Sequence, residues 1–172
     1  RGLGDVYKRQ LQPVLAETMA GNENLEIIFG DILKTNIPAL VKEEFAGLRP
    51  MACANLPYYI TTPVLAALLE SRAFEAVTVM VQKEAADRLA AVPGTRASSA
   101  ISCAVSYYAT SKMMFTAAPG SFYPAPKVTS AVIRLNVRKT PAVEVPGGDE
   151  KAFFSLIRAA FSQRRKTAAN AI

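Results

Sequence analysis

The stretch Met51-Ala52-Cys53-Ala54 is a short apolar run, and Asn55-Leu56-Pro57-Tyr58-Tyr59 follows it directly. The first four residues have the length and composition of a buried strand, whereas Asn and Pro are residues that form turns. Thr62-Pro63 then opens a helix that reaches Leu69, with Pro63 in the tolerated first turn. A strand, a polar strand end and a helix in succession predict an α/β layer fold.

The segments on either side continue the same alternation. We expect strands at 25–29, 76–81, from Phe115 onward and at 128–137, and helices at 11–21, 83–91 and 98–108. In the last strand Ala131, Ile133, Leu135 and Val137 share one face. Strands that alternate with helices favour a largely parallel sheet, and both 25–29 and 51–54 are predicted to be buried strands with polar residues at their carboxyl ends.

The chain is expected to divide into four parts. Residues 1–10 resemble translated sequencing-adapter DNA, so they are expected to be an artefact. Residues 11–140 form the α/β domain, and 141–150, rich in Pro and Gly, form a linker. Residues 151–172 carry the apolar stripe of a helix at Phe153, Leu156, Ile157, Ala160 and Phe161. That helix needs a packing partner, so it is predicted to start a truncated helical domain.

Composition excludes several classes of function. The 172 residues include no histidine and only two cysteines, Cys53 and Cys103, which we expect to be small buried side chains. Without histidine, a Ser-His-Asp or Cys-His hydrolase is excluded and no metal site can be drawn. No apolar run approaches the ~20 residues that span a bilayer, so we expect a cytoplasmic protein with no membrane contact.

The positive charge is concentrated in one part of the chain. The net charge is +6, and residues 1–121 carry equal numbers of basic and acidic residues, whereas 122–172 carry nine basic and three acidic residues. A one-sided excess of this kind is typical of a surface that binds a polyanion such as nucleic acid, although it can also serve solubility alone.

Asn55-Leu56-Pro57-Tyr58 is the motif that carries chemistry. The exocyclic amine of adenine is a poor nucleophile, because its lone pair is delocalised into the ring. An Asn side-chain oxygen and a neighbouring backbone carbonyl can accept its two hydrogens and direct the lone pair at an electrophile, while Tyr58 offers a face to an extruded base. The alternative is a simple strand-terminating turn.

The other candidate residues each have a structural alternative. Asp31 could accept a hydrogen bond from a nucleoside amine or could cap a helix. Phe122, between turns rich in Pro, could stack on a base or lie in the core. Arg164, Arg165 and Lys166 could contact phosphates or complement a helix dipole. Lys83 and Glu84 are predicted to start a solvated helix.

Seven blocks of sequence occur in the order found in one known family. They are Gly30-Asp31-Ile32-Leu33-Lys34, Asn55-Leu56-Pro57-Tyr58-Tyr59-Ile60, Val81-Gln82-Lys83-Glu84, Arg88-Leu89, Pro93-Gly94, Phe122-Tyr123-Pro124-Ala125-Pro126-Lys127-Val128 and Phe161-Ser162-Gln163-Arg164-Arg165-Lys166-Thr167. In these blocks the chain resembles the bacterial KsgA family of ribosomal RNA adenine N6,N6-dimethyltransferases, and the resemblance covers essentially all of 11–172.

The resemblance implies a Rossmann-like, class I methyltransferase domain that uses S-adenosylmethionine, followed by a small helical domain. It implies methylation of two adjacent adenines near the 3′ end of small-subunit rRNA in a pre-30S particle, by a monomer without a metal. It assigns Asp31, Ile32 and Asn55 to the cofactor, Asn55, Leu56, Pro57 and Tyr58 to the reaction centre, Tyr58 and Phe122 to base stacking, and Arg164, Arg165 and Lys166 to RNA.

The chain also departs from the family pattern. The Gly-rich loop and the acidic residue that family members place before the position of Leu11 are absent, and Ser98-Ser99 replaces an expected aromatic-Gly pair. We therefore expect a fragment that lacks the first strands of its fold. Two rival functions are a large-subunit rRNA adenine methyltransferase and a non-catalytic RNA-binding assembly factor that has lost its cofactor site.

Overall fold

The computed structural model describes residues 4–162, which fall into two units, one ending at Asp31 and the other beginning at Ile32. The first unit contains helix α1 (Gly4–Thr18), which begins before the predicted Leu11. The elements of the second unit are η1 (Ile32–Lys34), α2 (Ile37–Glu44), β1 (Met51–Asn55), η2 (Tyr58–Ile60), α3 (Thr61–Glu70), β2 (Ala76–Gln82), α4 (Lys83–Ala90), α5 (Ala100–Tyr108), β3 (Ala109–Ala117), η3 (Pro119–Ser121), β4 (Ser130–Val137), η4 (Pro146–Gly148) and α6 (Glu150–Ser162).

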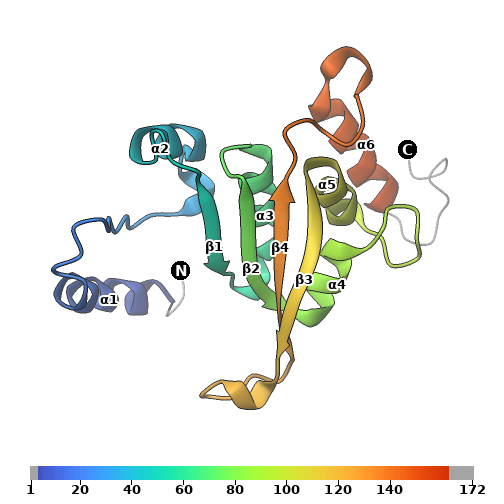
Figure 1. Cartoon of the computed structure of the whole chain (residues 1–172). Coiled ribbons are helices and arrows are strands. Elements are labelled where there is room, and N and C mark those ends of the chain that lie inside the picture. Colours follow the sequence, from blue (N-terminus) through green and yellow to red (C-terminus); the bar gives the residue numbers. More distant parts are fainter. Residues whose placement is uncertain (1–3, 163–172) are drawn as a thin grey trace. The chain divides into compact units, whose positions relative to one another are not determined.

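The described strands form one mixed sheet in the order β1-β2-β4-β3 (Figure 1). β1 and β2 are parallel, whereas β4 runs antiparallel to both β2 and β3. Three of the described strands, β1, β2 and β3, therefore run in the same direction, as expected, and β4 alone runs against them. β4 is reversed because no helix separates it from β3 except the single turn η3, so the chain returns as a hairpin, which pairs its strands in opposite directions.

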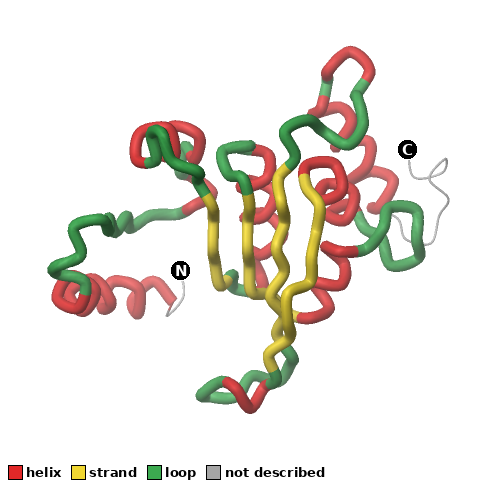
Figure 2. Tube along the Cα trace, in the orientation of Figure 1, coloured by secondary structure: helices red, strands yellow, loops and turns green. Residues whose placement is uncertain are grey.

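The core lies between the sheet and the helices α3, α4 and α5, which cover one face of it (Figure 2). Val77, Val79 and Val81 alternate along β2 and are at most 1% exposed. Ile133 and Leu135 do the same on β4, as the strand pattern predicted. The side chains between them point to the opposite face of the sheet, which the helices α3, α4 and α5 do not cover.

Two predicted buried strands differ from expectation. Residues 25–29 do not form a strand, and Leu25, Ile28 and Phe29 are about half exposed. High β propensity does not suffice, because a strand needs a partner backbone to satisfy its N–H and C=O groups, and no described residue pairs with this run.

β1 is a strand, but it is an edge strand of the described sheet. Its alternate residues are exposed, including Met51 and Cys53, so the expectation that Cys53 is buried is wrong. Cys103 on α5 is half-buried, and burial raises the pKa of its thiol. Neither cysteine is therefore the fully buried side chain that composition alone favoured.

Helix α6 finds the packing partner that its apolar stripe required. Phe153 and Phe154 pack against the rings of Tyr107 and Tyr108 at the end of α5, with ring centroids 5.2–5.6 Å apart. The preceding turn contains Gly147, whose positive φ of 71° favours glycine. The stripe is only partly covered, since Leu156 is 49% exposed.

Glu150, the first residue of α6, anchors the helix. Its carboxylate accepts hydrogen bonds from the hydroxyls of Tyr107 (2.9 Å) and Tyr108 (3.2 Å) and pairs with the guanidinium of Arg72, which also lies 5.5 Å from the Tyr108 ring centre. Burial by itself raises the pKa of Glu150, but the tyrosine hydrogen bonds and the charge of Arg72 outweigh it and lower that pKa. Burial and the nearby carboxylate raise the pKa of both tyrosines.

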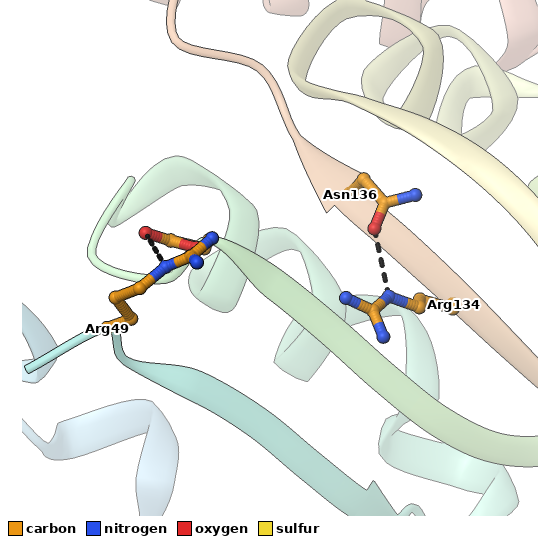
Figure 3. Close-up of polar contacts among 4 residues, drawn as sticks. Arg49, Arg134 and Asn136 are labelled. Carbon is orange, nitrogen blue, oxygen red and sulfur yellow. Dashed lines mark hydrogen bonds and ion pairs between the residues drawn. The ribbon is translucent and has the colours of Figure 1, made fainter.

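Exposed polar contacts lie at the end of the sheet where β1 and β2 begin (Figure 3). Arg49 donates to both carboxylate oxygens of Glu75 at 2.6–2.9 Å, and this interaction lowers the pKa of Glu75. On β4, Arg134 donates to the side-chain oxygen of Asn136 at 2.9 Å. These contacts lie at the end of the sheet opposite to the strand termini predicted to carry function.

The Glu150 anchor gives a prediction about stability and pH. Glu150→Gln should lower the free energy of unfolding by about 1 kcal/mol near neutral pH, after allowance for the partial exposure of the carboxylate. A carboxylate with a lowered folded-state pKa stabilises the fold above its unfolded pKa, and this contribution disappears as pH falls through the folded value. Urea unfolding should therefore show the wild type and variant converging below about pH 4.

The matched control is Glu144→Gln, which changes an exposed glutamate in the preceding loop for which no hydrogen bond is found in the described part of the chain. It should leave both the stability near neutral pH and its acid dependence unchanged. A Glu150→Gln difference that stays constant with pH would contradict the assignment of Glu150 as a charged anchor.

Candidate functional site

A pocket of about 540 Å³ lies at the carboxyl ends of β1 and β2. Two segments far apart in the sequence form it, the turn after β1 and the loop between β3 and β4. Its lining residues are Asn55, Leu56, Pro57, Tyr58, Tyr59, Met80, Phe122, Tyr123, Pro124, Pro126 and Ser130. The structure thus brings together Phe122 and the four residues of the predicted reaction centre.

The turn after β1 is held by backbone hydrogen bonds. The N–H of Leu56 donates to the carbonyl of Met80 at 3.2 Å, which extends the β1–β2 pairing by one residue, and the Leu56 side chain is only 7% exposed. The carbonyl of Pro57 accepts from the N–H of Ile60 and from the hydroxyl of Thr61, both at 3.1 Å. The turn therefore has a fixed geometry, as the presence of Pro57 predicted.

Two polar groups of the turn have no hydrogen-bond partner among the described residues. They are the side-chain amide of Asn55 and the backbone carbonyl of Leu56. Asn55 is exposed at the end of β1 and lines the pocket. Because the Pro57 carbonyl is already engaged, the Leu56 carbonyl is the neighbouring acceptor that remains available beside Asn55.

Aromatic rings form much of the pocket wall and its rim. Tyr58 is 48% exposed and Phe122 is half-buried, so Phe122 belongs to the pocket wall and not to the buried core. Tyr59 is 82% exposed and Tyr123 is fully exposed at the rim. Exposed rings at the edge of a pocket are typical of sites that stack on planar bases.

Among the described residues, none of those that line this pocket is charged. Its polar groups are amide and carbonyl oxygens and hydroxyls, and the rest of the wall is apolar or aromatic. Such a wall accepts hydrogen bonds from an amine and tolerates a positively charged group near ring faces and carbonyl oxygens. It offers no carboxylate that could act as a base in direct contact with a bound molecule.

The remaining predicted site residues lie elsewhere. Ile32 begins η1, which packs against α3, and does not line the pocket. Asp31 is the last residue of the first unit. Arg164, Arg165 and Lys166 lie outside the described residues. Their predicted roles stay predictions.

Other expectations concern metals, membranes and the start of α4. Among residues 4–162 no group of three acidic or cysteine side chains could hold a metal ion. No helix in that range is both long and apolar enough to cross a bilayer. Lys83 pairs with Asp87 at 2.7 Å on the exposed side of α4, which confirms the prediction of a solvated helix start.

Met80 and Ser130 also line the pocket, although no sequence motif singled them out. Met80 lies beside Asn55 in the register of β1 and β2, and Ser130 is the first residue of β4. The only local signal was the alternation of β4, which places Ser130 on the face opposite to Ala131. That signal becomes informative only once the pairing of β4 with β2 is known.

Comparisons with known proteins agree with this geometry. A family model described as ribosomal RNA adenine dimethylase matches residues 7–172. The chain is 44% identical over 165 residues to ribosomal RNA small subunit methyltransferase A of Alkaliphilus oremlandii, covering 95% of this chain and 57% of the relative. It is 46% identical over 163 residues to the protein of the same name from Geobacillus thermodenitrificans, covering 94% and 55%. The chain thus spans about half the length of the curated relatives it matches.

Two solved structures have a similar fold. A dimethyladenosine transferase from Plasmodium falciparum superposes with a TM-score of 0.69 at 26% identity, over 95% of this chain and 56% of that one. The 23S rRNA methyltransferase ErmE superposes with a TM-score of 0.66 at 22% identity, over 94% and 62%. These similarities confirm the predicted Rossmann-like methyltransferase fold.

The turn after β1 yields a prediction. Thr61 is 6% exposed, and Thr61→Val keeps its shape while removing the hydroxyl that donates to the Pro57 carbonyl. We expect a decrease of about 1 kcal/mol in the free energy of unfolding, measured in urea. Thr62→Val, at the exposed neighbouring position, is the control and should change stability little. Equal effects of the two substitutions would show that the hydrogen bond does not hold the turn.

Proposed function

The chain belongs to the ribosomal RNA adenine dimethylase family, and from this premise we propose that it transfers methyl groups to the N6 amines of two adjacent adenines near the 3′ end of small-subunit rRNA. The methyl donor is S-adenosylmethionine, and the substrate is the rRNA within a pre-30S particle, methylated in the cytoplasm by a monomer. The single observation that carries the proposal is the meeting of Asn55, Leu56, Tyr58 and Phe122 in one uncharged pocket.

The pocket suits an extruded adenine. The side-chain oxygen of Asn55 and the carbonyl of Leu56 are both available, and together they accept the two hydrogens of the amine. Accepting both hydrogens turns the nitrogen lone pair out of conjugation with the ring and towards the methyl donor. Tyr58 and Phe122 hold the base by contact with its faces, which offsets part of the stacking energy that extrusion costs.

The carbonyl and amide oxygens and the aromatic rings at this strand end also fit the cofactor. S-adenosylmethionine supplies an electrophilic methyl group on a positively charged sulfur. Carbonyl oxygens and aromatic faces tolerate that charge, and no cation in residues 4–162 lines the pocket to oppose it. We assign Asn55 to the boundary between cofactor and target amine, and Asp31 and Ile32 to the cofactor's nucleoside.

Methyl transfer here depends on position more than on acid–base catalysis. With the cofactor bound, the N–C bond would form at the oriented lone pair as the sulfur–methyl bond breaks and leaves a neutral thioether. The surplus proton of the alkylated nitrogen would pass to water, since no described carboxylate lines the pocket. The dimethylated product has no N6 hydrogen to donate to Asn55 and Leu56. The absence of both hydrogen bonds favours its release after the second transfer.

The names of the relatives favour the small subunit over the large subunit as the substrate. The likeness to the 23S rRNA enzyme, at 22% identity, concerns the fold alone. The open Asn55 amide and the open Leu56 carbonyl favour an enzyme over a non-catalytic assembly factor. A binding module has no need of two acceptors placed to receive a single amine.

The first test concerns Asn55. In a full-length protein that carries this sequence, Asn55→Ala should lower the single-turnover rate of methylation by about 10²-fold or more, because the amine is no longer oriented. Affinity for RNA should change little, since Asn55 holds the amine and not the phosphate backbone. The control is Asn136→Ala, at the other end of the sheet, which should leave the rate unchanged. A near wild-type rate for Asn55→Ala would refute the role of Asn55.

The second test concerns Arg164, Arg165 and Lys166, which we propose contact RNA phosphates. Replacing all three by glutamine should weaken binding to any RNA and lower the slope of log affinity against log salt concentration by roughly 0.7 to 0.9 for each phosphate that is no longer neutralised. Methylation at saturating RNA should survive. A lowered melting temperature with an unchanged salt slope would instead assign these residues to helix structure.

A further inference from the structure

We propose that the hydroxyl of Ser130 donates a hydrogen bond to a ring nitrogen of the target adenine and so helps the pocket to select that base. The inference rests on the proposed function, because it assumes that adenine enters the pocket. It adds a recognition contact on the side of the pocket away from Asn55. Three observations on burial, register and hydrogen bonding carry it.

Ser130 is almost fully buried yet lines the pocket. It is 3% exposed and is the first residue of β4, directly after the loop that carries Phe122. Of the three buried polar residues in the described part of the chain, the other two are Thr61 and Ser102. A buried hydroxyl costs free energy unless it is hydrogen-bonded, so each of the three needs a partner.

The register of the sheet places Ser130 on the face that carries Asn55. Asn55 pairs with Met80 on β2, and Ser130 pairs with Gln82, two residues further along the same strand. Paired residues share a face of a sheet, and so do alternate residues of one strand. Asn55, Met80 and Ser130 therefore share the face opposite to the buried Val79 and Val81, and all three line the pocket.

The Ser130 hydroxyl has no hydrogen-bond partner among the described residues, unlike the other two buried hydroxyls. Thr61 donates to Pro57 at 3.1 Å, and Ser102 donates to the carbonyl of Arg88 at 2.6 Å. No fully enclosed side-chain oxygen or nitrogen in the described range lacks a partner. The unpaired hydroxyl of Ser130 must therefore keep a small accessible area, and the pocket is the cavity that Ser130 lines.

The separation of Ser130 from Asn55 suits a base held between them. The two residues lie on the strands that flank β2, about 10 Å apart across the sheet and about 7 Å apart along it, so their backbones are about 12 Å apart. A base whose amine is bound at Asn55 directs its ring towards β4 across Met80. Adenine offers only unprotonated nitrogens as acceptors in its ring, and a serine hydroxyl can donate to any of them. The pocket would then hold the base by its amine, its faces and its far edge.

The test measures coupling between Ser130 and individual ring nitrogens. Single-turnover methylation by a full-length protein that carries this sequence is compared on small-subunit RNA containing adenine, 1-deazaadenine, 3-deazaadenine or 7-deazaadenine at the target position. We expect one of the three analogues to slow the wild type by about tenfold, and Ser130→Ala to slow methylation of adenine by a similar factor. For that analogue alone, Ser130→Ala should cause no further decrease in rate.

The control is Ser102→Ala, which removes the structurally bonded buried serine. It should lower the melting temperature and leave the pattern across the four substrates unchanged, whereas Ser130→Ala should change the pattern with little effect on melting. Penalties of Ser130→Ala that multiply with those of all three analogues would overturn the proposal. So would a wild type that no analogue slows, and this result does not depend on how any variant folds.

The same experiment distinguishes a failure of the proposed methyltransferase function from a failure of the Ser130 contact. If the wild type does not methylate unmodified adenine at N6, the proposed function is wrong before any variant or analogue is used. If it does, and the Ser130 coupling is absent, the function stands and the recognition contact is wrong.

Discussion

The position of β2 between a parallel and an antiparallel neighbour is the constraint on which the site depends. β1 and β2 end at the same end of the sheet because they are parallel, and β4 begins at that end because it runs in the opposite direction. Three strand termini therefore meet at one place. Asn55, Gln82 and Ser130 occupy those termini, and the loops attached to them form the rest of the pocket. The buried valines of β2 keep this arrangement rigid by locking the strand against the helix layer.

In the proposed function, the uncharged pocket and the basic residues elsewhere in the chain serve two different physical tasks. A polyanion is held by many weak, salt-sensitive contacts, which need cations spread over a surface. Orienting one amine needs a few fixed acceptors in surroundings that exclude water and competing charge. Cations beside Asn55 would compete for its oxygen and oppose a positively charged methyl donor. The excess of basic residues after position 122 is compatible with both tasks, because none of those up to position 162 lines the pocket.

Sequence alone predicted what depends on neighbours in the chain. The turn after β1, the helices at α3, α4 and α5, and the alternation of β4 all follow from local residue types, and each was located to within a few residues. Sequence failed where distant segments decide the outcome. The run at 25–29 has the residues of a strand but no described partner, and the edge position of β1 exposes Cys53. The direction of β4, and with it the place of Ser130, depends on a pairing across the sheet that no local pattern contains.

The two halves of the pocket lie far apart along the chain, and this separation has a consequence for folding. Asn55 and Leu56 can reach their final geometry once β1 and β2 pair through α3, a connection of modest length. Phe122 and Ser130 join them only after α4, α5 and β3 have been laid down and β4 has closed against β2. Closing so long a loop makes the pocket one of the non-local features that limit the folding rate. A nascent or partly unfolded chain therefore has the acceptor pair and Tyr58 without Phe122 and Ser130, and its pocket is complete only once β4 is in place.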